Sequence, residues 1–308
     1  MATSTARLVV LIAATLGASV AVAAQRNYDR RLEAPAGGRM TFDTDVGSIT
    51  VVGHDAPEVV IHARLQGSRS FLAHLHIDAE GTASGVTVSV HSAHRGWLGW
   101  LDWLDWLDSG PSRVRFAVEV PHDYPINLRT SGGRIGVRDL NASVRAASSG
   151  GGARVQNVAG TVDVHTSGGR IEAEHIAGPA ELSSSGGGIE VADSTGDLQL
   201  STSGGGIRLK NDEGRIHAVT SGGSIRAQLR ANRGLSLNTS GGGITLLLPQ
   251  NAHAAIDAQT SGGDIRADFP FSMTKIAAED HLVGAIGGGG PPISLRTSGG
   301  SIHIEPGT

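Results

Sequence analysis

Apolar and polar residues alternate in short runs along most of the chain from Met40 onward. A period of two is typical of β-strands that bury every second side chain. From Arg129 to Gly243 a Ser-Gly-Gly sequence interrupts these runs at a constant interval of 18 residues, and it then returns after 19, 21 and 37 residues. A constant interval of this length predicts a repeat architecture. The serines that begin these turns are Ser131, Ser149, Ser167, Ser185, Ser203, Ser221, Ser240, Ser261 and Ser298.

The 18-residue units align in columns without gaps. With the serine of each turn as position 0, positions 4, 6, 13 and 15 are apolar in five successive units. Each unit therefore predicts two short strands, nine residues apart, with two inward side chains apiece. Position 4 holds Ile135, Ala153, Ile171, Ile189 and Ile207, and position 6 holds Val137, Val155, Ala173, Val191 and Leu209. Position 13 holds Val144, Val162, Ala180, Leu198 and Ile216, and position 15 holds Ala146, Val164, Leu182, Leu200 and Ala218.

This pattern predicts an all-β fold, a parallel β-solenoid with 18-residue two-strand coils stacked about 4.8 Å apart. A helix is excluded for the array, because the apolar spacing is two and each glycine would cost a helix about 1 kcal/mol. Glycine is expected at the turns because the chain must reverse there, with φ above zero, close to the next coil. A lone coil would not fold, since its few buried side chains do not offset the ordering of 18 residues.

The chain before the array, residues 25–125, predicts an irregular N-terminal β region continuous with the solenoid. Gln25–Glu33 is polar and is expected to be a mobile lead-in. Phe42, Ile49 and Val51 have the same offsets from Asp45 as the inward residues of later units have from their serine, so this segment is interpreted as a degenerate repeat. Further alternating runs predict strands at Val59–Leu65, Phe71–Ile77, Val86–Val90 and Val114–Val120, with a turn at Asp78–Gly81.

Residues 126–308 are predicted to form the regular solenoid. The long interval between Ser261 and Ser298 contains a polar and glycine-rich passage. An open strand edge invites pairing with another chain, so something must cover the end of the stack. Residues 269–292 are the expected irregular capping segment.

The composition argues against several functions, and the first residues indicate the cellular compartment. A net charge of -4, with Lys and Arg scattered along the sequence, gives no footprint for nucleic acid. The absence of cysteine excludes disulfides and thiolate chemistry. Residues 1–24 have the pattern of a cleaved export signal: Arg7, an apolar run from Leu8 to Val22, and small residues before Gln25. An uncleaved membrane anchor is the alternative for this segment. We expect the mature protein to be exported to the periplasm or the cell surface.

The repeat carries a family resemblance. The chain resembles the bacterial putative adhesin β-solenoid family, a domain of unknown function similar to the head domain of autotransporter adhesins. The matching residues are the Thr-Ser-Gly-Gly-x-Ile-x-Val units from Thr130 to Leu246, the degenerate unit from Asp45 to Val51, and the closing segment from Gly287 to Ile304. The resemblance implies an exported, non-enzymatic envelope or surface protein, and it supplies no catalytic residues.

An insertion at residues 95–110 departs from that pattern and contains all four tryptophans of the chain, Trp97, Trp100, Trp103 and Trp106. Tryptophan favours sites that are half apolar and half wet, so this loop is a candidate contact with a membrane interface or a partner. The alternative is an expanded loop that folds back onto the side of the solenoid.

Other candidate sites have simpler structural explanations. His74 and His76 lie two residues apart, but no third ligand supports zinc, and surface histidines are the better interpretation. The polar residues at position 8 (Asp139, Asn157, His175, Asp193 and Asn211) suggest turn chemistry rather than a calcium or sugar ladder. The Ser and Thr columns before each glycine pair are read first as turn hydroxyls, before ice or glycan binding. The carboxylates Asp163, Glu172, Glu174, Glu181 and Glu190 share outward columns with Arg, Gln and Lys, as on a solvated face.

The sequence therefore predicts no catalytic residues, no cofactor and no metal. The expected function is an exported, non-catalytic structural or adhesive module of the cell envelope, binding an unknown envelope protein or glycan through repeated polar faces. Two alternatives stay open: a carbohydrate-active solenoid enzyme with converging acids, and an envelope-stress accessory protein that binds a partner through the Trp-rich loop.

Overall fold

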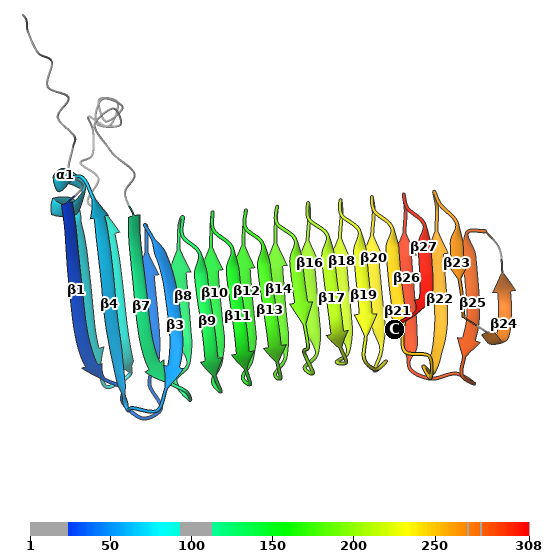
Figure 1. Ribbon diagram of the computed structural model, residues 1–308, viewed down its shortest axis with the longest axis horizontal. Helices are drawn as coiled ribbons and strands as arrows, with labels where there is room; N and C mark the ends of the chain where they lie inside the picture. Colours follow the sequence, from blue (N-terminus) through cyan, green and yellow to red (C-terminus); the bar gives the residue numbers. More distant parts are fainter. Residues whose placement is uncertain (1–23, 93–112, 270, 278, 308) are drawn as a thin grey trace, which may run out of the picture.

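The computed structural model describes residues 24–92, 113–269, 271–277 and 279–307. These residues form two facing sheets of 13 and 14 strands that run the length of an elongated solenoid (Figure 1). We call them sheet A, which runs from β1 to β23, and sheet B, which runs from β24 to β5. Each regular coil contributes one strand to sheet B, turns at Ser-Gly-Gly, and then contributes one strand to sheet A. The prediction of an all-β solenoid with two-strand coils is confirmed.

The regular array stacks its coils in parallel and in sequence order. Residues 18 apart are neighbours, as predicted: Ile171 pairs with Ile189, and their exposed fractions are 0% and 2%. The sheet B strands of the array are β8 (Ile126–Thr130), β10 (Val144–Ser148), β12 (Val162–Thr166), β14 (Ala180–Ser184), β16 (Leu198–Thr202), β18 (Ile216–Thr220) and β20 (Leu235–Thr239). The sheet A strands are β9 (Ile135–Leu140), β11 (Ala153–Val158), β13 (Ile171–Ile176), β15 (Ile189–Ala192), β17 (Ile207–Asp212), β19 (Ile225–Leu229) and β21 (Ile244–Leu248).

A buried hydroxyl joins each coil to the one before it. The residue that precedes each turn serine is buried Thr or Ser, and its hydroxyl donates to a glycine carbonyl of the preceding coil. Thr202 Oγ1, for example, donates to the Gly187 carbonyl at 2.7 Å and accepts from the Gly205 N–H at 3.3 Å. The interpretation of this column as turn hydroxyls is confirmed. The same donation recurs from Thr130, Ser148, Thr166, Ser184, Thr220, Thr239, Thr297 and Thr260.

Of the two reasons predicted for the turn glycines, the structure bears out the close approach of the next coil and not the positive φ. None of the paired glycines in the regular array has a positive φ. A Cβ atom on the second glycine of the pair would instead collide with the preceding coil; on Gly187 it would lie 2.0 Å from the Gly169 carbonyl oxygen. Glycine is required because the backbones of stacked turns approach too closely for any side chain.

The positive φ occurs at position 8 of the coil, in residues that are not glycine. Asp139, Asn157, His175, Asp193 and Asn211 have φ values between 54° and 61°. Asn and Asp tolerate this conformation better than most residues. Asn157 Nδ2 also donates to Asp139 Oδ1 at 2.8 Å, so the column links neighbouring coils. Turn chemistry at position 8, as predicted from the sequence, is confirmed.

The N-terminal region places a segment from the start of the chain inside the stack. β2 (Arg39–Thr44) lies between β6 (Gly85–Ser92) and β8, and β3 (Ser48–His54) lies between β7 (Arg113–Pro121) and β9. Ile49 pairs with Ile135 and Val51 with Val137, which confirms the degenerate repeat. Phe42 packs edge-on against Phe116 in this part of the core, with ring centroids 5.0 Å apart.

Three predictions for this region are wrong. Gln25–Glu33 is not a mobile lead-in, because β1 (Ala24–Glu33) pairs antiparallel with β4 (Glu58–Gly67) along its whole length. The run Phe71–Ile77 is not one strand, because it is divided between α1 (Arg69–His74) and β5 (Leu75–Thr82). Ser68 caps α1, and its Oγ accepts a hydrogen bond from the Phe71 N–H. The expected turn at Asp78–Gly81 lies within β5, which pairs antiparallel with β6.

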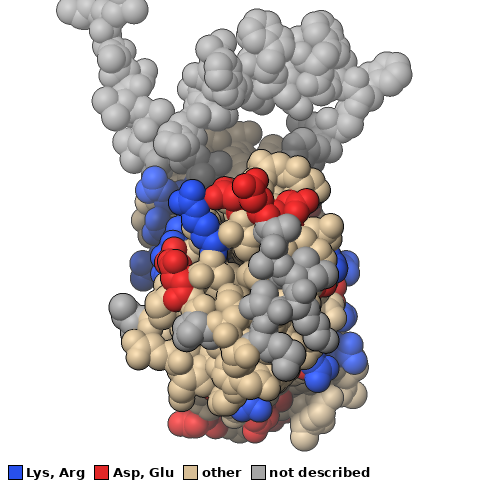
Figure 2. Space-filling view, turned by 90° about the vertical axis from the view of Figure 1, so that its right-hand side faces the viewer, with Lys and Arg blue, Asp and Glu red and all other residues tan. Residues whose placement is uncertain are grey.

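The C-terminal region also departs from sequence order. β26 (Pro292–Thr297) lies between β20 and β22 (Ala254–Thr260), and β27 (Ile302–Pro306) lies between β21 and β23 (Ile265–Ala267). The last coil of the chain thus sits inside the stack, and the preceding coil lies outside it. In the predicted capping segment, β24 (Phe271–Ala277) and β25 (His281–Ile286) form an antiparallel hairpin on β22, a more regular arrangement than the sequence suggested. Viewed from this end, charged side chains lie mainly around the rim (Figure 2).

Candidate functional site

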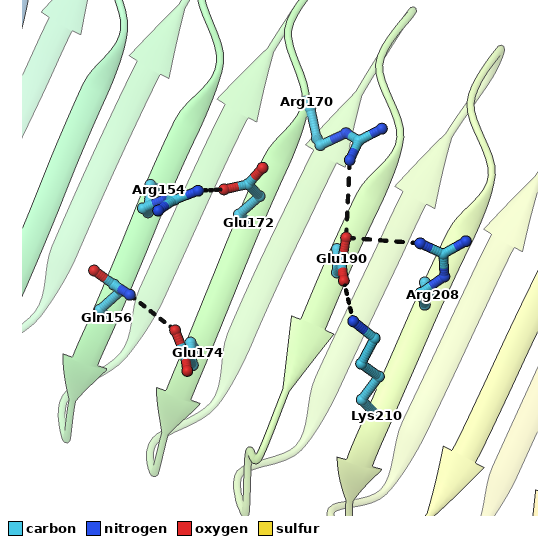
Figure 3. Close-up of polar contacts among 8 residues, drawn as sticks. All are labelled: Arg154, Gln156, Arg170, Glu172, Glu174, Glu190, Arg208 and Lys210. Atoms are coloured by element: carbon cyan, nitrogen blue, oxygen red, sulfur yellow. Dashed lines mark hydrogen bonds and ion pairs between the residues drawn. The ribbon is translucent and has the colours of Figure 1, made fainter.

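The outward face of sheet A carries the most organised polar groups among the described residues. Side chains at positions 5 and 7 of successive coils point outward and meet at strand spacing (Figure 3). Arg154 pairs with Glu172, and Gln156 Nε2 donates to Glu174 Oε2 at 2.8 Å. These contacts join residues 18 apart, so the register of the solenoid creates them.

Glu190 is the centre of the largest ion cluster on this face. Its carboxylate lies 2.6 Å from Lys210 Nζ, 3.8 Å from Arg170 and 3.9 Å from Arg208 (Figure 3). The hydrogen bond from Lys210 is the main cause that lowers the pKa of Glu190. A carboxylate held in the ionised form is poorly suited to donate a proton as a general acid.

A shallow depression of about 820 Å³ lies on the same face, nearer the N-terminal end. Its floor contains Gly136 and Gly152, whose missing side chains leave the backbone exposed to a ligand. Arg134, Arg138 and Arg154 border it. Position 3 alternates between arginine and glycine in this part of the array, which produces the hollow beside the guanidinium groups.

The outward face of sheet B carries a shallow trough, with a volume of about 550 Å³, that is lined mainly by hydroxyl groups. Exposed turn serines recur along it at every coil, with Arg129 and His165 among them. The turn serines that line this trough are Ser131, Ser149, Ser167, Ser185 and Ser203.

The titratable residues that the sequence singled out do not form one catalytic centre. His74 Nδ1 bonds to the Ser70 carbonyl in α1, and His76 faces His91 across the β5–β6 ladder, so the pair does not share one strand face. Glu174, His175 and Asp193 bring three possible ligand atoms within 4.8 Å of one another on the surface. Glu174 and His175 belong to different columns of the repeat, so the 18-residue pattern does not indicate that these three residues meet.

Asp212 is the one buried carboxylate among the residues that the structure describes. Asp212 lies at position 9, where the other coils hold Leu140, Val158, Ile176 and Ser194. Burial raises the pKa of Asp212 to about 6, although its carboxylate accepts hydrogen bonds from the Ser194 and Lys210 N–H groups at 2.8 and 3.0 Å. It faces the turn backbone and no depression, so its role is structural.

The tryptophan loop at residues 95–110 lies outside the described residues, so contact through Trp97, Trp100, Trp103 and Trp106 stays a prediction. The export signal at residues 1–24 also falls there, apart from Ala24, which begins β1. Within the described part of the chain, no helix is long and apolar enough to cross a membrane.

The chain belongs to a β-solenoid family of unknown function. The family described as Toastrack DUF4097 matches residues 39–305, most of the chain, and the resemblance inferred from the sequence is confirmed. No curated protein matches the sequence.

Solved structures that are similar share little sequence with it. A protein described as a putative lipid binding protein, from Parabacteroides distasonis, is 12% identical, with a TM-score of 0.45, over 92% of this chain and 97% of its own. A putative adhesin from Bacteroides fragilis is 11% identical, with a TM-score of 0.44, over 91% and 97%. A putative cell adhesion protein from Clostridium sporogenes is 10% identical, with a TM-score of 0.26, over 92% and 100%.

Proposed function

We propose that this protein is an exported, non-catalytic binding module of the bacterial cell envelope. Its two long polar faces would hold an envelope glycan or protein through many weak contacts. The observation that carries the proposal is that functional groups on both faces recur once per coil on open, shallow surfaces instead of converging in an enclosed cleft. Repeated contacts of this kind gain affinity from their number.

The electrostatics of the outward carboxylates support a non-catalytic role. A glycoside hydrolase needs one carboxylic acid with a raised pKa beside an ionised partner. On the described face of sheet A, Glu172 is paired with Arg154 and Glu190 with three cations, and the pKa of Glu190 is lowered. The raised pKa of Asp212 belongs to a buried turn that no substrate reaches.

The proposal is tested by asking whether the protein binds an envelope component without changing it chemically. The mature chain, residues 25–308, would be immobilised and exposed to peptidoglycan sacculi, lipopolysaccharide, anionic vesicles and envelope protein extract. We expect one of these fractions to be retained without chemical change. The release of new reducing ends from a glycan, lost in Glu172→Gln or Glu190→Gln, would replace this proposal with the hydrolase alternative.

A variant that lacks one complete coil, residues 167–184, is the matched control for multiplicity. Thr166 would then be followed by Ser185, which keeps the repeat in register. If affinity comes from many weak contacts, this deletion should weaken binding severalfold without abolishing it. Unchanged binding, or complete loss, would indicate one local site.

The tryptophan loop is a separate proposed contact, which rests on its sequence alone. We propose that Trp97, Trp100, Trp103 and Trp106 add contact with a membrane interface or a partner protein. Deleting residues 97–108 should reduce binding to vesicles or to a protein captured from envelope extract. Unchanged liposome, cell-wall and self-association behaviour would remove this role.

A further inference from the structure

Four arginines from separate segments of the chain lie in a single row across sheet A. Arg64 of β4 pairs with Arg115 of β7, and Arg115 pairs with Ser48 of β3. Ser48 and Arg134 directly precede the paired residues Ile49 and Ile135, so they are neighbours as well. The register then continues through β11 and β13. In spatial order the row is Arg64, Arg115, Ser48, Arg134, Gly152 and Arg170.

All four arginines are exposed and lie on the outward face. Arg64 lies in β4 and Arg115 in β7, whereas Arg134 and Arg170 directly precede β9 and β13. These four strands, with β3 and β11 between them, stand side by side in Figure 1. Neighbouring strands are about 4.8 Å apart, so the row extends over five steps, or about 24 Å. We call this set of residues the arginine row.

The arginine row is not neutralised by the face that carries it. Among the described residues, no carboxylate lies within ion-pair distance of Arg64, Arg115 or Arg134. Elsewhere on the same face, Glu172 pairs with Arg154, and Glu190 pairs with Arg208, Lys210 and Arg170 of the row. Asp29, on the strand next to β4, pairs with His62 instead of Arg64. The row is thus left with three arginines that have no ion pair with any described residue, Arg64, Arg115 and Arg134.

The pairing of Arg64 with Arg115 is unfavourable for folding. Like charges directly opposite one another in an antiparallel ladder destabilise a sheet. Ser48 and Gly152 separate the other arginines, so their guanidinium groups recur at about twice the strand spacing, roughly 9.6 Å. A row in which three arginines have no ion pair within the described part of the chain, two of them opposite one another at one end, is suited to a ligand that brings several negative charges.

The surface next to the arginine row is recessed because its side chains are small. The next outward-facing residue on each strand is small. Ala117 follows Arg115, Thr50 follows Ser48 and Gly136 follows Arg134, each two residues along the chain. Thr50 and Gly136 also line the 820 Å³ depression that Arg134 borders. These small side chains beside Arg134 leave a hollow over β3, β9 and β11, in which part of an extended chain can lie.

We propose that the arginine row binds a linear acidic polysaccharide through its carboxylate groups. Arginine binds carboxylates through charge-assisted hydrogen bonds, and on this face Arg154 already donates one to Glu172. A nucleic acid fits less well, because the outward positions of the row and of its floor hold no Phe, Tyr or Trp for base stacking. A membrane surface fits less well, because the recessed floor has no large apolar side chain to insert.

This inference rests on the proposed function for its setting, since it names the ligand class of that envelope-binding face. The test uses the full mature chain and oligogalacturonates as the acidic glycan, with dextran as the neutral control. The variant Arg64→Gln/Arg115→Gln/Arg134→Gln removes three charges and keeps polar side chains of similar reach. Its matched control is Arg39→Gln/Arg145→Gln/Arg296→Gln, which removes three charges from sheet B.

At low ionic strength we expect wild type to bind oligogalacturonate and not dextran, and to weaken as salt is added. The row variant should bind about tenfold more weakly or worse, as expected for the loss of several charge-assisted contacts, while the control changes less than about twofold. Its thermal midpoint should be equal to or above that of wild type, because the Arg64–Arg115 repulsion is removed. A folded row variant with this loss would support the proposal.

Three results would overturn it: no oligogalacturonate binding by wild type, equal losses in the row variant and the control, or a lowered thermal midpoint that accounts for the loss. Tighter row-dependent binding to oligothymidylate or to phosphatidylglycerol vesicles would assign the row to nucleic acid or membrane instead. The proposed envelope function can survive each of these outcomes. Enzymatic cleavage of envelope glycans by the protein would contradict the proposed non-catalytic function, but it would not show what the arginine row binds.

Discussion

The regular array and the two ends of the solenoid follow different construction rules. From β8 to β21 each coil stacks on the coil that precedes it in sequence. At both ends the order is broken: β2 and β3 enter the stack from the start of the chain, and β26 and β27 from its end. In both places antiparallel strands lie outside the inserted coil. The middle can therefore be extended or shortened by units, whereas each end is built once by segments distant in sequence.

The largest effect is expected from removing the inserted C-terminal coil. Truncation after Pro291 takes away the parallel partners of β20, β21, β22 and β23 together. We expect residues 249–291 to lose protection from proteolysis and hydrogen exchange, with a loss of more than about 4 kcal/mol in unfolding free energy. The exposed edges of β20 and β21 should also promote aggregation.

Deleting residues 167–184 is the comparison for that truncation. This deletion removes a similar length of chain from the array and lets like columns meet again. It should leave a cooperative fold with a smaller loss of stability in urea. Equal damage from the two changes would show that the ends are no different from the middle.

Adding a methyl group to one turn glycine of the array should be the next most destabilising change. In Gly187→Ala the new Cβ would lie 2.0 Å from the Gly169 carbonyl oxygen, so the stacked turns must separate. We expect a loss of about 3 kcal/mol or more in urea unfolding. Gly186→Ala is the control, since its nearest neighbour would be 3.4 Å away and the cost should be below about 1 kcal/mol. Similar costs for both would contradict the close-approach explanation.

Asp212 should make the stability of the array depend on pH. Its folded pKa is raised from 3.8 to about 6, so the protonated form is favoured by folding. This contribution is complete below the unfolded pKa and is lost as pH rises through 6. The unfolding free energy should thus fall by roughly 3 kcal/mol between pH 3 and 7, and Asp212→Asn should remove that part of the slope. Parallel pH profiles for the two proteins would exclude this role.

The buried hydroxyl column should contribute a smaller amount at each coil. Thr202→Val removes the donor to the Gly187 carbonyl and the acceptor for the Gly205 N–H without changing the shape of the side chain. Leaving these groups unpaired should cost about 1 to 3 kcal/mol. Thr202→Ser keeps the hydroxyl, as Ser148 and Ser184 do naturally, and should cost less. A larger cost for Ser than for Val would assign the role of Thr202 to its methyl group.

The difference between middle and ends also explains which predictions could be made from the sequence. Ile171 and Ile189 are neighbours because a constant interval places them in one column, and the degenerate unit at Ile49 could be recognised by the same offsets. The position of Ile302 between β21 and β23 could not, because its unit matches both neighbours equally well. That order is seen only in the strand pairing of the folded chain.

The arginine row was hidden for the same reason. Arg64, Arg115 and Arg134 appear scattered along the sequence, and no motif connects them. They come together because β4 runs antiparallel to β7 and because β3 lies between β7 and β9. By contrast, the pairing of Arg154 with Glu172 could have been expected, since the two residues are 18 apart on one outward column.

The sequence by itself determined the two-strand coil, the inward columns and the polar nature of both faces. These features are repeated locally, so each unit specifies its neighbour through like residues at equal spacing. The tertiary structure decided the order of the coils at both ends and the juxtaposition of Arg64, Arg115 and Arg134, which have no ion pair among the described residues. Those features depend on contacts between segments far apart in the chain, and no local pattern encodes which distant strand will pair with which.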